Sequence, residues 1–149
     1  MANPTFHQYD PAKTIFSWSL LPGLFTGYAE GEFIKFMRAG KLWISKGGAD
    51  GETTRVQNRD RRGIIQITLK QGSTTNAMLS AILQADENSG TGVAPGSLVD
   101  MSGTTPQTVF GAANVWIEGW PEAGFMAQDE ATRIWTFNTD ASEIFLGGN

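Results

Sequence analysis

The chain offers few side chains of the kinds that enzymes use for covalent or acid–base chemistry. It contains one histidine, His7, and no cysteine, and no Gly-x-Ser-x-Gly segment occurs in it. Ser-His-Asp and Cys-His sites need a histidine beside the nucleophile, so a lone histidine in an irregular N-terminal segment argues against both. Without cysteine, disulfides, thiolate catalysis and cysteine-ligated metal centres are excluded.

Carboxylates and glycine-rich turns supply the remaining candidates for chemistry. Asp129/Glu130 and Glu118/Glu122 are carboxylate pairs of the kind that glycoside hydrolysis uses, but solvated surface charge is the favoured interpretation. The segment "GGADGET", residues 47–53, is similar to a phosphate-binding loop, yet Glu52 stands where the lysine is required. We therefore expect no enzyme activity, no catalytic residue, no metal site and no cofactor.

A cluster of arginines is the most conspicuous charged feature. Because Asp60 lies inside this cluster, no aromatic residue is interleaved and the protein is acidic overall, the pattern favours protein–protein docking over nucleic-acid binding. A nucleic-acid-binding β-barrel remains the alternative. The predicted inter-subunit contact residues are Lys46, Asp50, Glu52, Arg55, Arg59, Asp60, Arg61 and Arg62.

Composition and charge indicate one globular domain with an uneven charge distribution. The 149 residues are 40% hydrophobic and 17% charged, with a net charge of −4. Residues 1–73 hold ten Lys/Arg and six Asp/Glu, whereas residues 74–149 hold one Arg and nine Asp/Glu. A basic first half and an acidic second half predict differently charged faces or a self-complementary surface, unless the distribution is chance.

Hydrophobic periodicity predicts a mainly β fold. Strands are expected at 14–20, 32–46 with a bend at Gly40, 53–71, 97–101, 109–120, 132–138 and 142–148. Residues 46–62 are too polar to build a core, so the long hairpin that they close should project. One helix of about three turns is expected from residue 74, capped by Thr74, Thr75 or Asn76, with Met78, Leu79, Ile82 and Leu83 on one stripe. The fold class is an antiparallel β-sandwich or barrel of about seven or eight strands with one α-helix, in a single domain spanning 1–149.

The segment "FIKFMRAGKLWISKGGADGETTRVQNRDRRGIIQITLKQGSTTNAMLSAILQAD" resembles the central part of tail-tube proteins of contractile-tailed bacteriophages. The shared order is a strand, a Gly-rich charged loop, a "D-R-x-G-x-I-x-I-T-L-x-Q" strand and a "Ser/Thr-x-N-x-x-L-x-x-(I/L)-L" helix. The C-terminal "RIWTFNTDASEIFLGGN" is also similar to the ends of such chains, and the resemblance extends from about Thr14 onward.

This resemblance implies a structural subunit that forms homohexameric rings. Such rings stack helically into a hollow tube that conducts double-stranded DNA during ejection, inside a contractile sheath. The implied partners are further copies of the chain, the sheath, baseplate, tail-terminator and tape-measure proteins, and DNA in transit. The implied location is the virion tail, assembled in the host cytoplasm without membrane insertion. A tube-end, baseplate or secretion-system tube subunit is the alternative within this fold.

The resemblance also implies roles for particular segments. The strands in 32–46, 53–71, 109–120 and 132–138 would line the lumen, and the loop 46–62 would reach the neighbouring ring. Glu30, Glu32 and Glu118 are the predicted acidic lumen-lining residues, since carboxylates repel passing phosphates. Lys35, Arg38 and Arg133 lie in the same segments and would oppose a purely acidic lumen.

Overall fold

The computed structural model describes residues 9–21, 23, 25–102 and 107–147. His7 and the other residues outside these ranges are not described. Its elements are the 3-10 helix η1 (Pro11–Lys13), the helix α1 (Thr74–Ser89), and eight strands: β1 (Thr14–Trp18), β2 (Ile34–Arg38), β3 (Trp43–Gly47), β4 (Thr53–Gln57), β5 (Arg62–Lys70), β6 (Ala94–Asp100), β7 (Thr108–Ile117) and β8 (Thr132–Phe145). The mainly β fold with one helix is as predicted.

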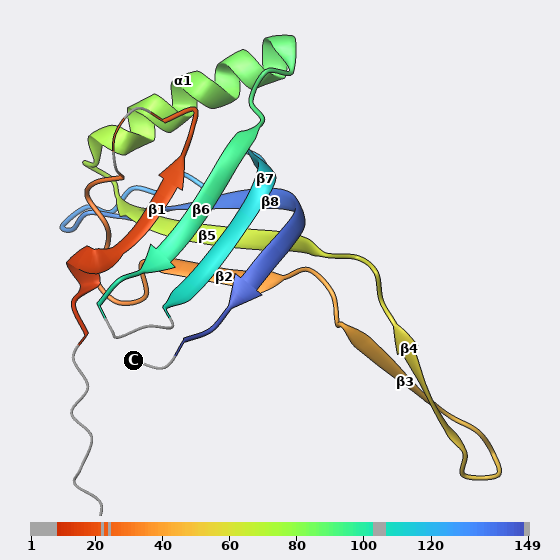
Figure 1. Ribbon diagram of the computed structural model, residues 1–149. Coiled ribbons are helices and arrows are strands. Elements are labelled where there is room, and N and C mark those ends of the chain that lie inside the picture. The colour runs from red at the N-terminus through yellow and green to blue at the C-terminus, as the bar shows by residue number, and fades with distance from the viewer. Residues whose placement is uncertain (1–8, 22, 24, 103–106, 148–149) are drawn as a thin grey trace, which may run out of the picture.

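Six of these strands form one antiparallel sheet in the order β1-β6-β7-β8-β5-β2 (Figure 1). The sheet curls because β8 is long and changes neighbours along its length: its first half pairs with β5 and its second half pairs with β7. β1 and β2 are the two edges of this sheet. β3 and β4 pair only with each other and project away from the body as a hairpin (Figure 1).

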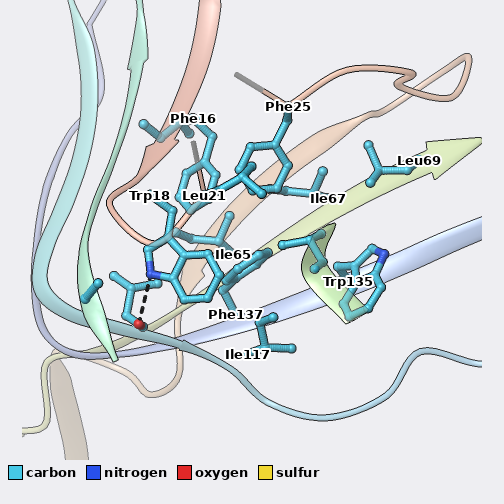
Figure 2. Close-up of a cluster of buried hydrophobic side chains, with 14 of the residues drawn as sticks. Phe16, Trp18, Leu21, Phe25, Ile65, Ile67, Leu69, Ile117, Trp135 and Phe137 are labelled. Carbon is cyan, nitrogen blue, oxygen red and sulfur yellow. Dashed lines mark hydrogen bonds between the residues drawn. The ribbon is translucent and has the colours of Figure 1, made fainter. Parts of the chain in front are cut away.

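The core lies inside the curl, where α1 and the segment after β1 cover the sheet. The alternation in β5 buries Ile65, Ile67 and Leu69 on this side, as the sequence predicted, and leaves Ile64, Gln66 and Thr68 on the opposite, open face. α1 contributes Leu79 and Leu83 to the same core. Aromatic rings from β1 and β8 fill its centre (Figure 2).

The start of α1 is held to the sheet by polar contacts that its apolar stripe does not reveal. Ser73 is the N-cap, accepting a hydrogen bond from the Thr75 amide, so the cap lies one residue before those predicted. The Asn76 amide nitrogen donates to the carbonyl oxygen of Lys70 at 2.8 Å, while its oxygen accepts from Trp135 Nε1 at 2.9 Å. Asn76 therefore joins the helix, the end of β5 and β8.

Two other predictions differ from the observed elements. α1 has 16 residues instead of about three turns, because the polar segment 84–89 continues the helix until Gly90, whose φ of 68° forms a left-handed C-cap. The strands predicted at 132–138 and 142–148 are one strand, β8, since Thr139 and Ser142 are buried and continue the ladder between them.

Replacing Asn76 with alanine is expected to lower the free energy of unfolding by about 2 kcal/mol. The change leaves the buried Trp135 N–H and a strand-end carbonyl without their partners, at roughly 1 kcal/mol each or more. Urea denaturation measures the loss. Gln84→Ala, on the exposed side of the same helix, should change stability little, and equal urea midpoints for the two variants would contradict the assigned role.

Candidate assembly interface

The projecting hairpin contributes nothing to the core of its own chain. Every residue of β3 and β4 is exposed, including the large apolar side chains, and none belongs to the core cluster. Ile44 and Val56 lie opposite each other in the register, and the Arg55 guanidinium stacks 3.7 Å from the centre of the Trp43 ring. A two-stranded hairpin without a packed face has little stability alone, so this one presents apolar surface for a contact.

The base of the hairpin is fixed to the body, which sets the direction in which it projects. Ser142 of β8 donates its amide and its hydroxyl to the Arg61 carbonyl, each at 2.8 Å. Arg38 of β2 in turn donates to the Ser142 carbonyl oxygen at 2.8 Å and to its hydroxyl at 3.2 Å. Segments that are distant in sequence thus meet where the hairpin begins.

A second fixed point lies within the arginine cluster itself. The Arg62 guanidinium donates to both carboxylate oxygens of Asp60, at 2.9 and 2.8 Å. These hydrogen bonds lower the pKa of Asp60 to about 2, so its carboxylate stays ionised at physiological pH. Asp60 also accepts from the Arg62 amide, which closes a local turn between β4 and β5. Asp60 and Arg62 therefore shape the base of the hairpin.

The eight predicted contact residues are spread along the hairpin and do not form one site. Asp50 and Glu52 lie in the tip between β3 and β4, while Lys46 and Arg55 lie on the strands themselves. Arg59, Asp60 and Arg61 form the connection to β5, which begins at Arg62. The tip is acidic and the base is basic, a segregation that the sequence order of the charges did not make visible.

We call residues 41–62 the arm. The arm holds six Lys/Arg and three Asp/Glu, a net charge of +3, while the rest of the chain holds five Lys/Arg and twelve Asp/Glu, a net charge of −7. The charge asymmetry predicted between two halves of the sequence is therefore, in space, an asymmetry between a basic arm and an acidic body. Complementary charges of this kind favour association of the arm of one copy with the body of another.

The predicted lumen residues fall into two groups. Glu118 follows β7 and lies across from Thr136, on the open face that also carries Gln66 and Lys35. Glu30 and Glu32 lie in the exposed connection before β2 and not on a strand. The open face of the sheet thus carries both a cation and an anion.

The two arginines that were expected to oppose an acidic lumen do not lie on the open face. Arg133 is buried on the core side, where it donates to the Gly124 carbonyl oxygen at 3.0 Å. Arg38 is opposite Gly63 on that same side and holds Ser142. Strand alternation contained the signal for Arg133, because it continues the buried series Trp135, Phe137 and Thr139.

The candidate carboxylates for catalysis partly come together. Glu118, Glu122 and Glu130 line a groove of about 770 Å³ between the open face and residues 119–131, whereas Asp129 is not among the lining residues. Glu130 accepts a hydrogen bond from the Gly72 amide at 2.5 Å and so has a structural role. Among the described residues, no three or more His, Cys, Asp or Glu side chains are grouped to hold a metal ion.

The tryptophans follow the packing prediction in part. Trp18 and Trp135 are buried, with Trp18 Nε1 donating to the Val115 carbonyl oxygen at 3.1 Å. Trp43 and Trp120 are exposed, one on the arm and one in the connection between β7 and β8. No helix in the described part of the chain is long and apolar enough to cross a membrane.

Comparison with known proteins places the fold. No protein-family model matches the chain, and no curated protein matches it in sequence. Among solved structures, the anti-feeding prophage cap (AFP tube terminating cap) matches with a TM-score of 0.58 and 12% identity, covering 99% of this chain and 97% of that one. The sheath/tube terminator of the PVC extracellular contractile injection system, in its extended state, matches with a TM-score of 0.60 and 11% identity, covering 95% and 99%.

A third match is a chain of the PVC sheath–tube complex in the extended state, with a TM-score of 0.54 and 12% identity over 93% of this chain and 92% of that one. All three similarities span nearly the whole of both chains, at sequence identities too low to be informative about function. The curled antiparallel sheet with one helix is therefore a fold that this chain shares with components of contractile injection systems.

Proposed function

We propose that the protein is a structural subunit of the tube of a contractile phage tail or related injection apparatus. In this role, hexameric rings stack into a hollow tube that conducts double-stranded DNA inside a contractile sheath. The observation that carries the proposal is the arm: it projects from a body of the tube-component fold, is exposed on every strand residue, and is opposite in charge to that body.

The two sheet edges support assembly into rings. β1 and β2 each have one side without a strand partner in the described chain, and β2 contains the apolar residues Ile34, Phe36 and Met37. Unpaired edges of this kind pair readily with other strands, and closure of the sheet across neighbouring copies removes them. A contact between unlike edges is heterologous, and such contacts close into rings when the rotation permits.

The open face suits the wall of a channel for DNA. It is the face that α1 does not cover, and Lys35, Gln66, Thr136 and Glu118 lie across it on neighbouring strands. One cation and one anion in that row leave it electrically neutral. A neutral wall releases few counterions from DNA, so the nucleic acid can pass without being held.

A tube-end subunit is the second candidate for the same assembly. It is favoured by the names of two of the matched structures, which are a tube terminating cap and a sheath/tube terminator. A tube-body subunit stacks on copies of itself without limit, whereas a tube-end subunit forms a ring that closes a tube made of another protein. Baseplate and secretion-system tube subunits share the first property or the second.

Electron microscopy of the purified protein, concentrated at moderate salt, tests the proposal. Hollow tubes of uniform width are expected for a tube-body subunit, and isolated rings of one size for a tube-end subunit. A monodisperse monomer at every concentration would contradict both. Binding to duplex DNA that weakens steeply with salt in such a monomer would instead support the nucleic-acid-binding alternative.

A further inference from the structure

The connection between β7 and β8, residues 118–131, is the second large exposed apolar feature of the molecule. Phe125 and Met126 are 78% and 60% exposed, and Trp120 is also exposed. The connection contains four carboxylates, Glu118, Glu122, Asp129 and Glu130, and no Lys or Arg. We call it the β7–β8 loop. An exposed Phe-Met pair surrounded by carboxylates is a protein-docking pattern, with apolar anchors inside a charged rim.

The β7–β8 loop is held in place although its apolar residues are exposed. Arg133 donates to the Gly124 carbonyl oxygen at 3.0 Å, and its guanidinium lies 5.1 Å from the centre of the Phe125 ring. The Trp120 indole packs against Trp135 and donates to Glu87 of α1. Near its end, Ala131 donates its amide to Gln71. A loop fixed in this way loses little conformational entropy on binding, which favours its use as a docking element.

The arm presents the complementary surface. Leu42, Trp43, Ile44 and Val56 are 38–51% exposed and lie toward the base of the hairpin, away from its acidic tip. Lys41, Arg59 and Arg61 lie at the same base. In the described part of the chain no carboxylate forms a salt bridge with these three cations, whereas Arg62 is already paired with Asp60. The surface is therefore apolar and basic, where the loop is apolar and acidic.

The two surfaces lie at opposite ends of the molecule. The arm leaves the body at Arg62, the first residue of β5, and the β7–β8 loop ends at Thr132, which pairs with Lys70, the last residue of β5 (Figure 1). The nine residues of β5 separate them by about 30 Å at ~3.3 Å per residue. One chain cannot bring its own loop and arm together, but two copies arranged head to tail can.

We propose that the β7–β8 loop of one copy docks on the base of the arm of a second copy. Phe125 and Met126 pack against the exposed apolar side chains of the arm, and the loop carboxylates face Lys41, Arg59 and Arg61. This contact rests on the proposed function in that both require assembly of identical copies. The contact is heterologous, so it closes into a ring or continues as a stack according to the rotation between copies.

Disulfide cross-linking tests the contact directly, because the chain contains no cysteine of its own. Met126→Cys combined with Val56→Cys is expected to give a ladder of covalent oligomers on oxidation. The matched control combines Met126→Cys with Val109→Cys, since Val56 and Val109 are each 39% exposed but Val109 lies on β7 and outside the proposed contact. The control pair should give no ladder.

Charge exchange tests the electrostatic part. Glu122→Lys with Asp129→Lys, or Arg59→Glu with Arg61→Glu, is expected to weaken assembly about 30-fold or more, since like charges then face each other. All four substitutions in one chain should restore it. Glu30→Lys with Glu32→Lys makes the same size of charge change outside the contact and should leave assembly unchanged. Circular dichroism checks that each variant is folded.

The failure of this contact and the failure of the proposed function give different results. Rings or tubes that form without a cross-link between positions 56 and 126, or a fourfold variant that does not recover assembly, would overturn this contact and leave the proposed function standing. Absence of any assembly by the unmodified chain at all concentrations would overturn both. A ladder that stops at one size indicates closed rings, and one that continues indicates stacking, and either supports the contact.

Discussion

Replacing residues 41–59 with an Asn-Gly turn is expected to abolish assembly and leave a folded monomer. The Ala39 amide donates to the Arg62 carbonyl oxygen at 3.0 Å, so the chain can be rejoined across this point by a tight turn. The deletion removes no residue of the core and retains the Asp60–Arg62 pair. The free energy of unfolding should therefore change by no more than about 1 kcal/mol, as is usual for surface changes.

Light scattering after size-exclusion chromatography measures the loss of assembly, and urea denaturation measures the stability. The expected result is a monomer at concentrations where the unmodified chain forms rings or tubes. A matched control replaces only the tip, residues 48–51, with Asn-Gly, which keeps both strands and the basic base of the arm. Assembly by the long deletion would contradict the role of the arm, and failure of the tip control alone would move the contact to the tip.

Local patterns in the sequence predicted most of the elements and the buried faces correctly. The alternation of Ile65, Ile67 and Leu69 predicted the core side of β5, and the stripe of α1 predicted Leu79 and Leu83. The polar composition of 46–62 predicted a hairpin that projects. These features depend on residues two to four positions apart, which the sequence displays directly.

Contacts between distant segments could not be predicted in the same way. Asn76 holds Trp135, 59 positions away, and Ser142 holds Arg61, 81 positions away. Both contacts depend on which strands are neighbours and on their register, and neither of these leaves a local pattern. The division of charge between arm and body was hidden for the same reason, because Lys13, Lys35 and Lys70 belong to the body although they lie in the basic half of the sequence.

The roles of the candidate lumen residues remain predictions, although their positions are now defined. Glu118 lies on the open face, and Glu30 and Glu32 lie in a connection beside the β2 edge. If copies pair through that edge, the two connection carboxylates would lie at the junction between neighbours and not along the wall. The wall itself would then carry charge mainly from Lys35 and Glu118.

Replacing Phe137 with alanine is expected to lower the free energy of unfolding by about 3–5 kcal/mol. Its ring is fully buried in β8, with the rings of Phe16, Trp18 and Phe25 at centroid distances of 5.3, 5.2 and 6.0 Å (Figure 2). Truncation leaves a cavity bordered by all three. For a domain of this size the loss corresponds to a fall in melting temperature of about 6–20 °C, and scanning calorimetry measures it.

Phe125→Ala is the matched control, because it removes the same atoms from a ring that is 78% exposed. The melting temperature of the Phe125 variant should change by no more than about 2 °C, the usual range for a surface substitution in a domain of this size. Its assembly, by contrast, should weaken strongly, because an exposed aromatic anchor contributes to binding and not to folding. Equal losses of stability in the two variants would contradict the assigned core. Unchanged assembly in the Phe125 variant would contradict the docking of the β7–β8 loop. Opposite effects of one chemical change at two positions would show that folding and assembly depend on separate sets of residues in this chain.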